Sequence, residues 1–119
     1  MKGINSFDIL LLAHLIGDFL LQNEWMAFNK QKRWLPLLVH SAVYTIAIAA
    51  ASFALLDQPL SVYGILLVFA GHIVLDRGSF IAWWYKRVTR CTDPKTWWLK
   101  VVYDQTFHLI LLYAALQLG

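Results

Sequence analysis

The sequence LPLLVHSAVYTIAIAAASFALL, residues 35–56, contains no Asp, Glu, Lys or Arg. A helix needs roughly 20 predominantly apolar residues to cross the hydrocarbon core of a bilayer, so this stretch predicts a membrane-spanning helix. Three further apolar stretches flank it, at residues 7–22, 60–80 and 101–118. Because lipid offers the backbone no hydrogen-bond partners, we expect all four stretches to be helical.

The composition of the whole chain also indicates a membrane protein. Of its 119 residues, 60% are hydrophobic and only 14% are charged, whereas an average soluble domain has about 25% charged residues. The single cysteine, Cys91, excludes an internal disulfide framework. We therefore expect an all-α fold: one transmembrane domain, residues 1–119, built as a four-helix up-down bundle with an interfacial segment between the third and fourth helices.

The basic residues lie mainly in two of the three connections between the predicted helices, and the turn at residues 57–59 has none. By the positive-inside rule, both basic connections face the cytoplasm and both termini lie outside, with Lys2 as a dissenting residue. The two groups are Lys30, Lys32 and Arg33, and Arg77, Lys86, Arg87, Arg90, Lys95 and Lys100.

The connection at residues 81–100 also contains Trp83, Trp84, Trp97 and Trp98. Indole rings mixed with cations are typical of a segment at the level of the lipid headgroups. The four tryptophans could anchor this segment in the interface or form a lid that binds substrate, and the sequence leaves both interpretations open.

Each predicted helix carries one histidine: His14, His40, His72 and His108. Three of the four have an aspartate four residues away along the chain, and residues with this spacing share a helix face. With six Asp in 119 residues, a given histidine has roughly a 10% chance of such a neighbour, so three pairs are unlikely to arise by coincidence. The pairs are His14 with Asp18, His72 with Asp76, and Asp104 with His108.

These seven side chains are expected to meet in one layer of the bundle. At 1.5 Å per residue they all fall roughly 5 to 12 Å below the cytoplasmic boundary. Ionisable groups are costly in hydrocarbon and usually mark function there, and imidazole and carboxylate are preferred ligands of zinc and related ions. We predict a site for one or two divalent ions, zinc first, made by His14, Asp18, His40, His72, Asp76, Asp104 and His108. His–Asp hydrogen bonds that only lock the helix register are the alternative.

Seven donors exceed what one tetrahedral zinc ion can use. Two divalent ions, three aspartates and a bridging hydroxide sum to zero charge, which favours two ions, although one ion with supporting aspartates stays open. Four neighbouring side chains are expected to orient ligands or contact substrate: Gln22, Tyr44, Arg77 and Gln105.

Three motifs carry a family resemblance: LAHLIGDFLLQ at residues 12–22, GHIVLDR at 71–77 and DQTFH at 104–108. The chain resembles a family of small bacterial and phage integral membrane proteins catalogued as a domain of unknown function. More loosely, it is similar to membrane-bound metal-dependent hydrolases with His-x-x-x-Asp helices. The first resemblance implies a membrane fold with these polar positions, and it implies no activity. We expect the protein to lie in the bacterial inner or plasma membrane.

The expected function is that of a metal-dependent hydrolase that cleaves a lipid-like or membrane-accessible ester, amide or phosphoester at the cytoplasmic face. Asp18 or Asp76 is the expected general base. A metal-ion or proton transporter or channel and a metal or haem redox protein are the alternatives, but the outer halves of the second and third helices lack the polar groups that a conduit needs. Membrane lipid is the expected partner, a lipid-like substrate and a second copy of the chain are further candidates, and nucleic acid is not expected.

Overall fold

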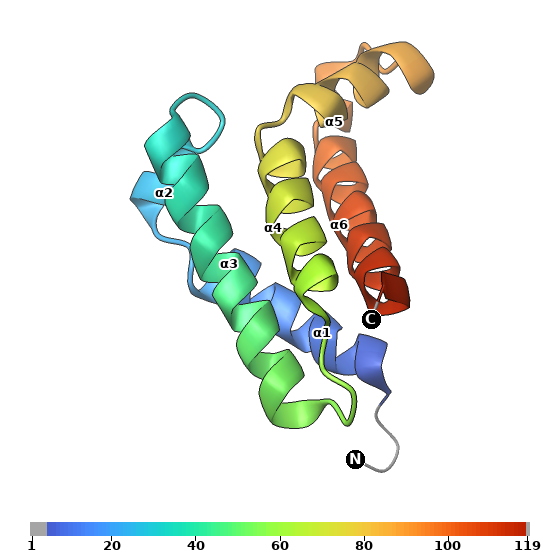
Figure 1. The fold of residues 1–119 in the computed structure, drawn as a ribbon. Coiled ribbons are helices and arrows are strands. Elements are labelled where there is room, and N and C mark those ends of the chain that lie inside the picture. Colours follow the sequence, from blue (N-terminus) through green and yellow to red (C-terminus); the bar gives the residue numbers. More distant parts are fainter. Residues whose placement is uncertain (1–4, 119) are drawn as a thin grey trace.

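The computed structural model describes residues 5–118, and every regular element within this range is a helix (Figure 1). The prediction of an all-α fold is therefore confirmed. Lys2, which dissents from the charge pattern, lies outside the described residues. Three long helices and one that ends in a π-helical turn make the body of the molecule: α1 (Ser6–Leu15) continued by η1 (Ile16–Leu20), α3 (Trp34–Leu55), α4 (Val62–Asp76) and α6 (Trp98–Leu118). The connections contain α2 (Glu24–Asn29), α5 (Ser79–Trp83), η2 (Trp84–Val88) and η3 (Pro94–Thr96).

Local polar residues explain where several helices begin. The side chains of Asn5, Asn23 and Ser61 accept hydrogen bonds from backbone N–H groups in the first turns of α1, α2 and α4. These bonds satisfy donors that have no partner within the helix. Between α3 and α4, the hydroxyl of Ser52 accepts a hydrogen bond of 2.6 Å from the backbone N–H of Leu60, which fixes the turn that reverses the chain.

The predicted helix at residues 60–80 is too long at its carboxyl end. The α4 helix ends at Asp76, because Gly78 has a φ of 88°, in the left-handed region that stops a helix. The chain then continues as Ser79–Val88, bent by 54° from α4. The other predicted boundaries move less: η1 ends at Leu20, before Asn23 caps a new helix, and α6 begins at Trp98.

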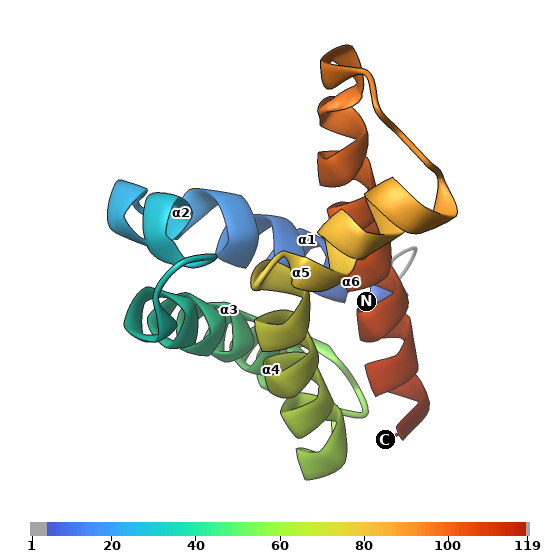
Figure 2. The ribbon, with the colours of Figure 1, turned by 90° about the horizontal axis from the view of Figure 1, so that it is seen from above.

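The four long segments pack around one interior. In Figure 1, α3, α4 and α6 run alternately down, up and down. The α1 helix lies behind α3 and α4 and runs more nearly across the view. Both α1 and α4 pack against α3 and against α6, so the contacts form a closed ring. Seen from above, the same helices surround a common centre (Figure 2). Residues on different helices can therefore meet inside the ring.

Apolar residues fill the half of this interior that lies away from the basic connections. The core there includes Leu10, Ile48, Val68, Leu112 and Ala115, all fully buried. In Figure 1, these stretches of α1, α3, α4 and α6 lie in the lower part of the molecule, where α1 begins and α6 ends. The polar interior residues therefore gather at the opposite end.

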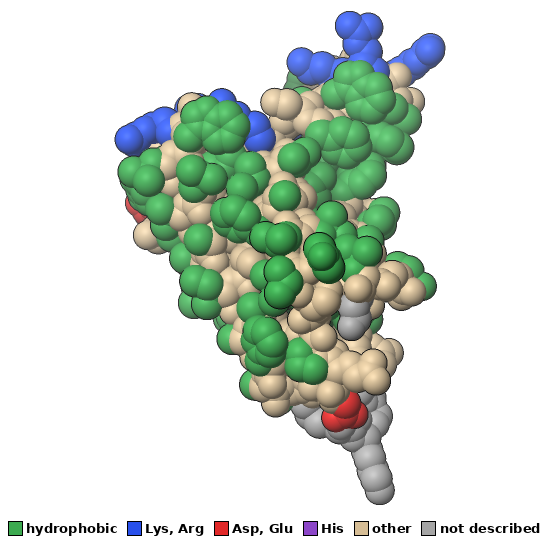
Figure 3. Space-filling view, viewed as in Figure 1, with side chains coloured by type: hydrophobic (Ala, Val, Ile, Leu, Met, Phe, Trp, Pro, Cys, Tyr) green, Lys and Arg blue, Asp and Glu red, His purple; other side chains and the backbone are tan. Residues whose placement is uncertain are grey.

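The sides of the molecule are apolar as well. Figure 3 shows hydrophobic side chains along the flanks, and Lys and Arg in two groups at one end, which we call the basic end. A soluble domain buries its large apolar residues and exposes its charges, so this distribution suits a lipid environment. Among residues 5–118, α3 is the one helix that is by itself long and apolar enough to span a membrane, and α4 with Ser79–Val88 meets the same criterion as a bent pair. Strongly exposed apolar residues include Leu20, Ile46, Phe53, Val62, Val74 and Ile110.

Candidate metal centre

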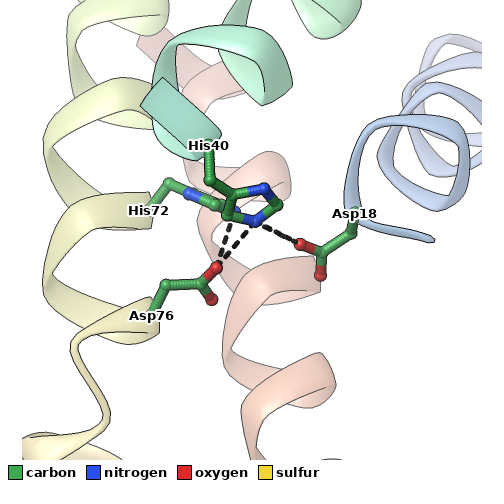
Figure 4. A group of neighbouring side chains, drawn as sticks. All are labelled: Asp18, His40, His72 and Asp76. Atoms are coloured by element: carbon green, nitrogen blue, oxygen red, sulfur yellow. Dashed lines mark hydrogen bonds and ion pairs between the residues drawn. The ribbon is translucent and has the colours of Figure 1, made fainter. Parts of the chain in front are cut away.

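Two aspartates and two histidines meet inside the ring near the basic end (Figure 4). We call Asp18, His40, His72 and Asp76 the His–Asp quartet. Asp18 comes from η1, His40 from α3, and the other two from successive turns of α4. Nε2 of His40 lies 3.1 Å from Oδ1 of Asp18 and 2.9 Å from Oδ2 of Asp76, and Nε2 of His72 lies 3.5 Å from each of the same two oxygens. Both histidines are fully buried, and the aspartates are only 2–3% exposed.

These four ligand atoms have the spacing that one metal ion requires. Bonds of about 2.0–2.2 Å to a tetrahedral zinc ion separate neighbouring ligand atoms by about 3.3–3.6 Å. The four nitrogen–oxygen separations in the quartet are 2.9–3.5 Å, and all four ligand atoms lie within 4.8 Å of one another. Hydrogen bonds alone explain the geometry less well, because each Nε2 faces two carboxylate oxygens and carries at most one proton. A divalent cation at the centre would interact favourably with all four atoms, so the donor set fits a metal ion.

A second group of donors shares Asp18 with the quartet. Asp18, Asp104 and His108 also offer ligand atoms that lie within 4.8 Å of one another. Nδ1 of His108 donates a hydrogen bond of 2.7 Å to the backbone carbonyl of Asp104, since a carbonyl can only accept. Nε2 of His108 then lies 3.1 Å from Oδ1 of Asp76 without the geometry of a hydrogen bond. This nitrogen is therefore available either to bind a cation or to carry the second proton of a charged imidazole ring.

The charge of the site includes a residue that the sequence analysis missed. Nζ of Lys30 lies 3.0 Å from Oδ2 of Asp76, and the lysine side chain is only 16% exposed. In the sequence, Lys30 is one of several cations in a connection, and no spacing relates it to Asp76. Three aspartates contribute −3, Lys30 contributes +1 and one divalent ion contributes +2, which sums to zero. The charge balance that favoured two ions omitted Lys30, and with this residue included a single ion neutralises the site.

His14 lies beside the two groups of donors and belongs to neither. Its Nδ1 is 2.6 Å from the hydroxyl of Tyr44, and its Nε2 is 2.7 Å from Oε1 of Gln105. The amide nitrogen of Gln105 in turn donates to Oδ2 of Asp18 at 3.2 Å and to Oδ2 of Asp104 at 3.3 Å. The structure thus places Tyr44 and Gln105 around His14, and Gln105 also contacts two of the candidate ligands.

The other two supporting residues make different contacts. The amide nitrogen of Gln22 donates to the backbone carbonyl of Asp18 at 3.3 Å, and its Oε1 is buried without a hydrogen-bond partner. The guanidinium of Arg77 lies 4.4 Å from the ring centroid of Trp34, a cation–π contact. Within residues 5–118, Arg77 makes no hydrogen bond or ion pair with the His–Asp quartet, although it follows Asp76 in the chain.

A cavity of about 300 Å³ connects the site with the basic end. Its lining includes exposed side chains, among them Gln31, Lys100 and Val101, so the cavity opens at the surface. In Figure 3 the surface is hollowed between the two groups of Lys and Arg. None of Trp83, Trp84, Trp97 and Trp98 lines this cavity. The polar and charged residues in the lining are Asp18, Gln22, Lys30, Gln31, Asp76, Lys100, Asp104 and Gln105.

The family described as "Protein of unknown function (DUF3307)" matches residues 7–118, so the chain belongs to that family. This match confirms the family resemblance carried by the three motifs. No curated protein and no solved structure gives a significant match. The looser likeness to membrane-bound metal-dependent hydrolases therefore gains no support from these comparisons.

Proposed function

We propose that the protein is a membrane-embedded, metal-dependent hydrolase whose substrate reaches the site from the basic end. One observation carries this proposal: the buried His–Asp quartet adjoins a polar cavity that opens at that end. A structural metal site is normally closed off by its ligands, whereas a catalytic site keeps access for water and substrate. Asp18 and Asp76 both belong to the quartet and line the cavity, which supports such access.

In this proposal all four long segments cross the membrane, with the basic end in the cytoplasm and both termini outside. The apolar flanks and the two groups of Lys and Arg at one end support this orientation (Figure 3). Exposed Trp97 and Trp98 lie beside these cations in the sequence, which is the arrangement of an interfacial anchor. The site then lies within reach of the inner leaflet.

A divalent ion held by the quartet would have to accept water as a further ligand beyond the four side chains, and it would then supply an activated water and polarise a scissile carbonyl or phosphoryl oxygen. The chain's own residues would bind the ion at a buried position that is reached through the polar cavity. Asp18 and Asp76, the bases expected from the sequence, are both needed as ligands here. Asp104 lines the cavity outside the quartet, and its side chain is 25% exposed. We therefore assign Asp104 as the proton acceptor.

The charge of the cavity favours an anionic substrate. Its lining contributes −3 from aspartates and +2 from Lys30 and Lys100, so a divalent ion brings the total to +1. The cavity is large enough for a polar headgroup, whereas an acyl chain would remain in the lipid. Among the ester, amide and phosphoester expected from the sequence, a membrane-accessible phosphoester fits this charge best.

A proton or metal-ion conduit is the rival function. It requires polar groups along the full depth of the membrane. The apolar core around Leu10, Ile48, Val68 and Leu112 fills the half of the interior opposite the basic end. A pocket that is open at one end supports hydrolysis better than transport.

The test uses purified protein reconstituted into liposomes that contain a panel of phospholipids and neutral lipid esters. We expect metal-dependent release of product from a phosphoester, detected by mass spectrometry, and loss of this activity in His72→Ala. Gln117→Ala is the matched control, because Gln117 is exposed near the end of α6. His-dependent flux of protons or metal ions, with no turnover of any lipid in the panel, would overturn the enzyme proposal.

A further inference from the structure

Four hydrogen bonds lead from the middle of α3 to the carboxylates of the site. They join the hydroxyl of Tyr44 to Nδ1 of His14, Nε2 of His14 to Oε1 of Gln105, and the amide nitrogen of Gln105 to Asp18 and Asp104. Tyr44 and His14 are fully buried. The bonds connect residues of α3, α1 and α6 with the π-helical turn η1.

The chemistry of Gln105 fixes the direction of this chain. An ionised carboxylate only accepts hydrogen bonds, so the two protons of the Gln105 amide point to Oδ2 of Asp18 and Oδ2 of Asp104. Its carbonyl oxygen then faces His14 and needs a donor. Nε2 of His14 must therefore carry a proton, which leaves Nδ1 of the neutral ring as the acceptor for the hydroxyl of Tyr44.

We infer that Tyr44, His14 and Gln105 form a directional hydrogen-bond chain that positions the carboxylates, and that His14 is a positioning residue and not a metal ligand. This inference rests on the proposed metal site. The amide of Gln105 holds Oδ2 of Asp18, so Oδ1 is the oxygen presented to the histidines of the quartet. Partners of this kind set the orientation of metal ligands and raise the affinity of the site.

Packing around Tyr44 supports the same role. Its ring stacks on His72 with centroids 4.0 Å apart and an angle of 19°, and it meets His14 edge-on at 5.4 Å. A Cβ atom at Gly17 would lie only 3.1 Å from Cδ2 of Tyr44, so glycine allows η1 to approach this ring closely. To act as a ligand through either nitrogen, His14 would have to break the hydrogen bond at that nitrogen within a packed interior.

The direct test is nitrogen-15 NMR of protein with labelled histidine, reconstituted into lipid nanodiscs. In the metal-free protein, we expect His14 to be the neutral ring protonated at Nε2. After loading with cadmium-113, we expect couplings from the metal to Nε2 of His40 and His72 and none to His14. Protonation of His14 at Nδ1 alone, or a cadmium coupling to His14, would overturn the inference. If cadmium does not bind, the proposed metal site is wrong. The tautomer of His14 in the metal-free protein then still shows whether the hydrogen-bond chain exists.

Two substitutions at residue 14 separate positioning from simple packing. The amide of glutamine reaches the place of Nε2, whereas the amide of asparagine reaches only the place of Nδ1. His14→Gln can still donate to Gln105, so we expect it to keep most of the cadmium affinity. His14→Asn loses that bond and should weaken affinity by about 10- to 100-fold. Equal losses in two variants with unchanged helicity would contradict the directional chain.

Discussion

Asp76 is approached by nitrogen atoms from three different parts of the chain. Nε2 of His40 lies 2.9 Å away, Nζ of Lys30 lies 3.0 Å away, and Nε2 of His108 lies 3.1 Å away. Lys30 and a metal ion would share the same oxygen, Oδ2. Lys30 therefore competes with the ion for Asp76 and also repels it.

This competition gives a prediction for Lys30→Met. Removing the ammonium group should tighten binding of a divalent ion by roughly tenfold, because a repulsive charge leaves the site. The metal-free variant should also be less stable, since Asp76 loses a partner in a buried position. Isothermal titration with zinc and thermal melts in detergent measure the two effects. Lys32→Met is the control because Lys32 is exposed, and weaker zinc binding by Lys30→Met would refute the competition.

A second prediction at this scale distinguishes ligands from supporting residues. His72→Ala removes a ligand atom and should lose nearly all bound metal. Gln105→Ala removes only hydrogen bonds to Asp18 and Asp104, so metal affinity should fall by about 10- to 100-fold. Metal content after gel filtration and titration of the remaining affinity provide the comparison. An equal and complete loss in both variants would place Gln105 among the ligands.

At the residue scale, sequence could identify the polar residues but not their partners. The spacing of four placed His72 and Asp76 on one face of a helix, and the structure brings both to the quartet. His14 and Asp18 have the same spacing, yet the ring of His14 faces Tyr44 and Gln105. Which way a ring points depends on tertiary neighbours, and helical periodicity carries no information about them.

Two short irregular segments decide how the elements present the site. Asp18 lies in the π-helical turn η1, and such turns occur frequently at functional sites. Gly78 ends α4 two residues after Asp76 and turns the chain into α5. The sequence prediction extended one uninterrupted helix to Phe80, across the polar residues 76–79. The break depends on one backbone angle, which a hydropathy pattern does not reveal.

Gly78→Ala tests the importance of this break. A non-glycine residue with a φ of 88° costs about 1–2 kcal/mol, and the new Cβ would lie 2.9 Å from the side-chain amide of Gln31. We expect a loss of about that size in the free energy of unfolding, measured by denaturation in mild detergent. Ser79→Ala, at an exposed position next to it, should have almost no effect. Equal stability of Gly78→Ala and the parent protein would show that the break is not needed.

The molecule as a whole has a polar interior near one end and apolar flanks. Sequence predicted the helical class from its apolar stretches, and it predicted the gathering of polar residues from their spacing and their depth along the helices. The proposed arrangement places all four segments across the membrane, although within the described residues only α3 is by itself long and apolar enough to span it. It depends on surroundings that the chain itself does not contain.

Cysteine labelling tests this arrangement. In a protein with Cys91→Ser, Gln58→Cys should react with an impermeant reagent from outside, and Lys95→Cys should react only from the cytoplasm, as the charge pattern requires. Both positions are exposed in the structure, so a lack of reaction cannot be due to burial. The reverse labelling pattern would turn the cavity outward, and labelling of both positions from one side would contradict the spanning topology.

Elemental analysis of the purified protein tests most directly whether the His–Asp quartet binds a divalent metal ion. Protein purified without chelator should carry about one equivalent of zinc or a similar divalent ion, and a folded His40→Ala/His72→Ala variant should carry almost none. Metal content near zero in the parent protein, even after reconstitution with zinc, manganese or iron, would contradict the claim.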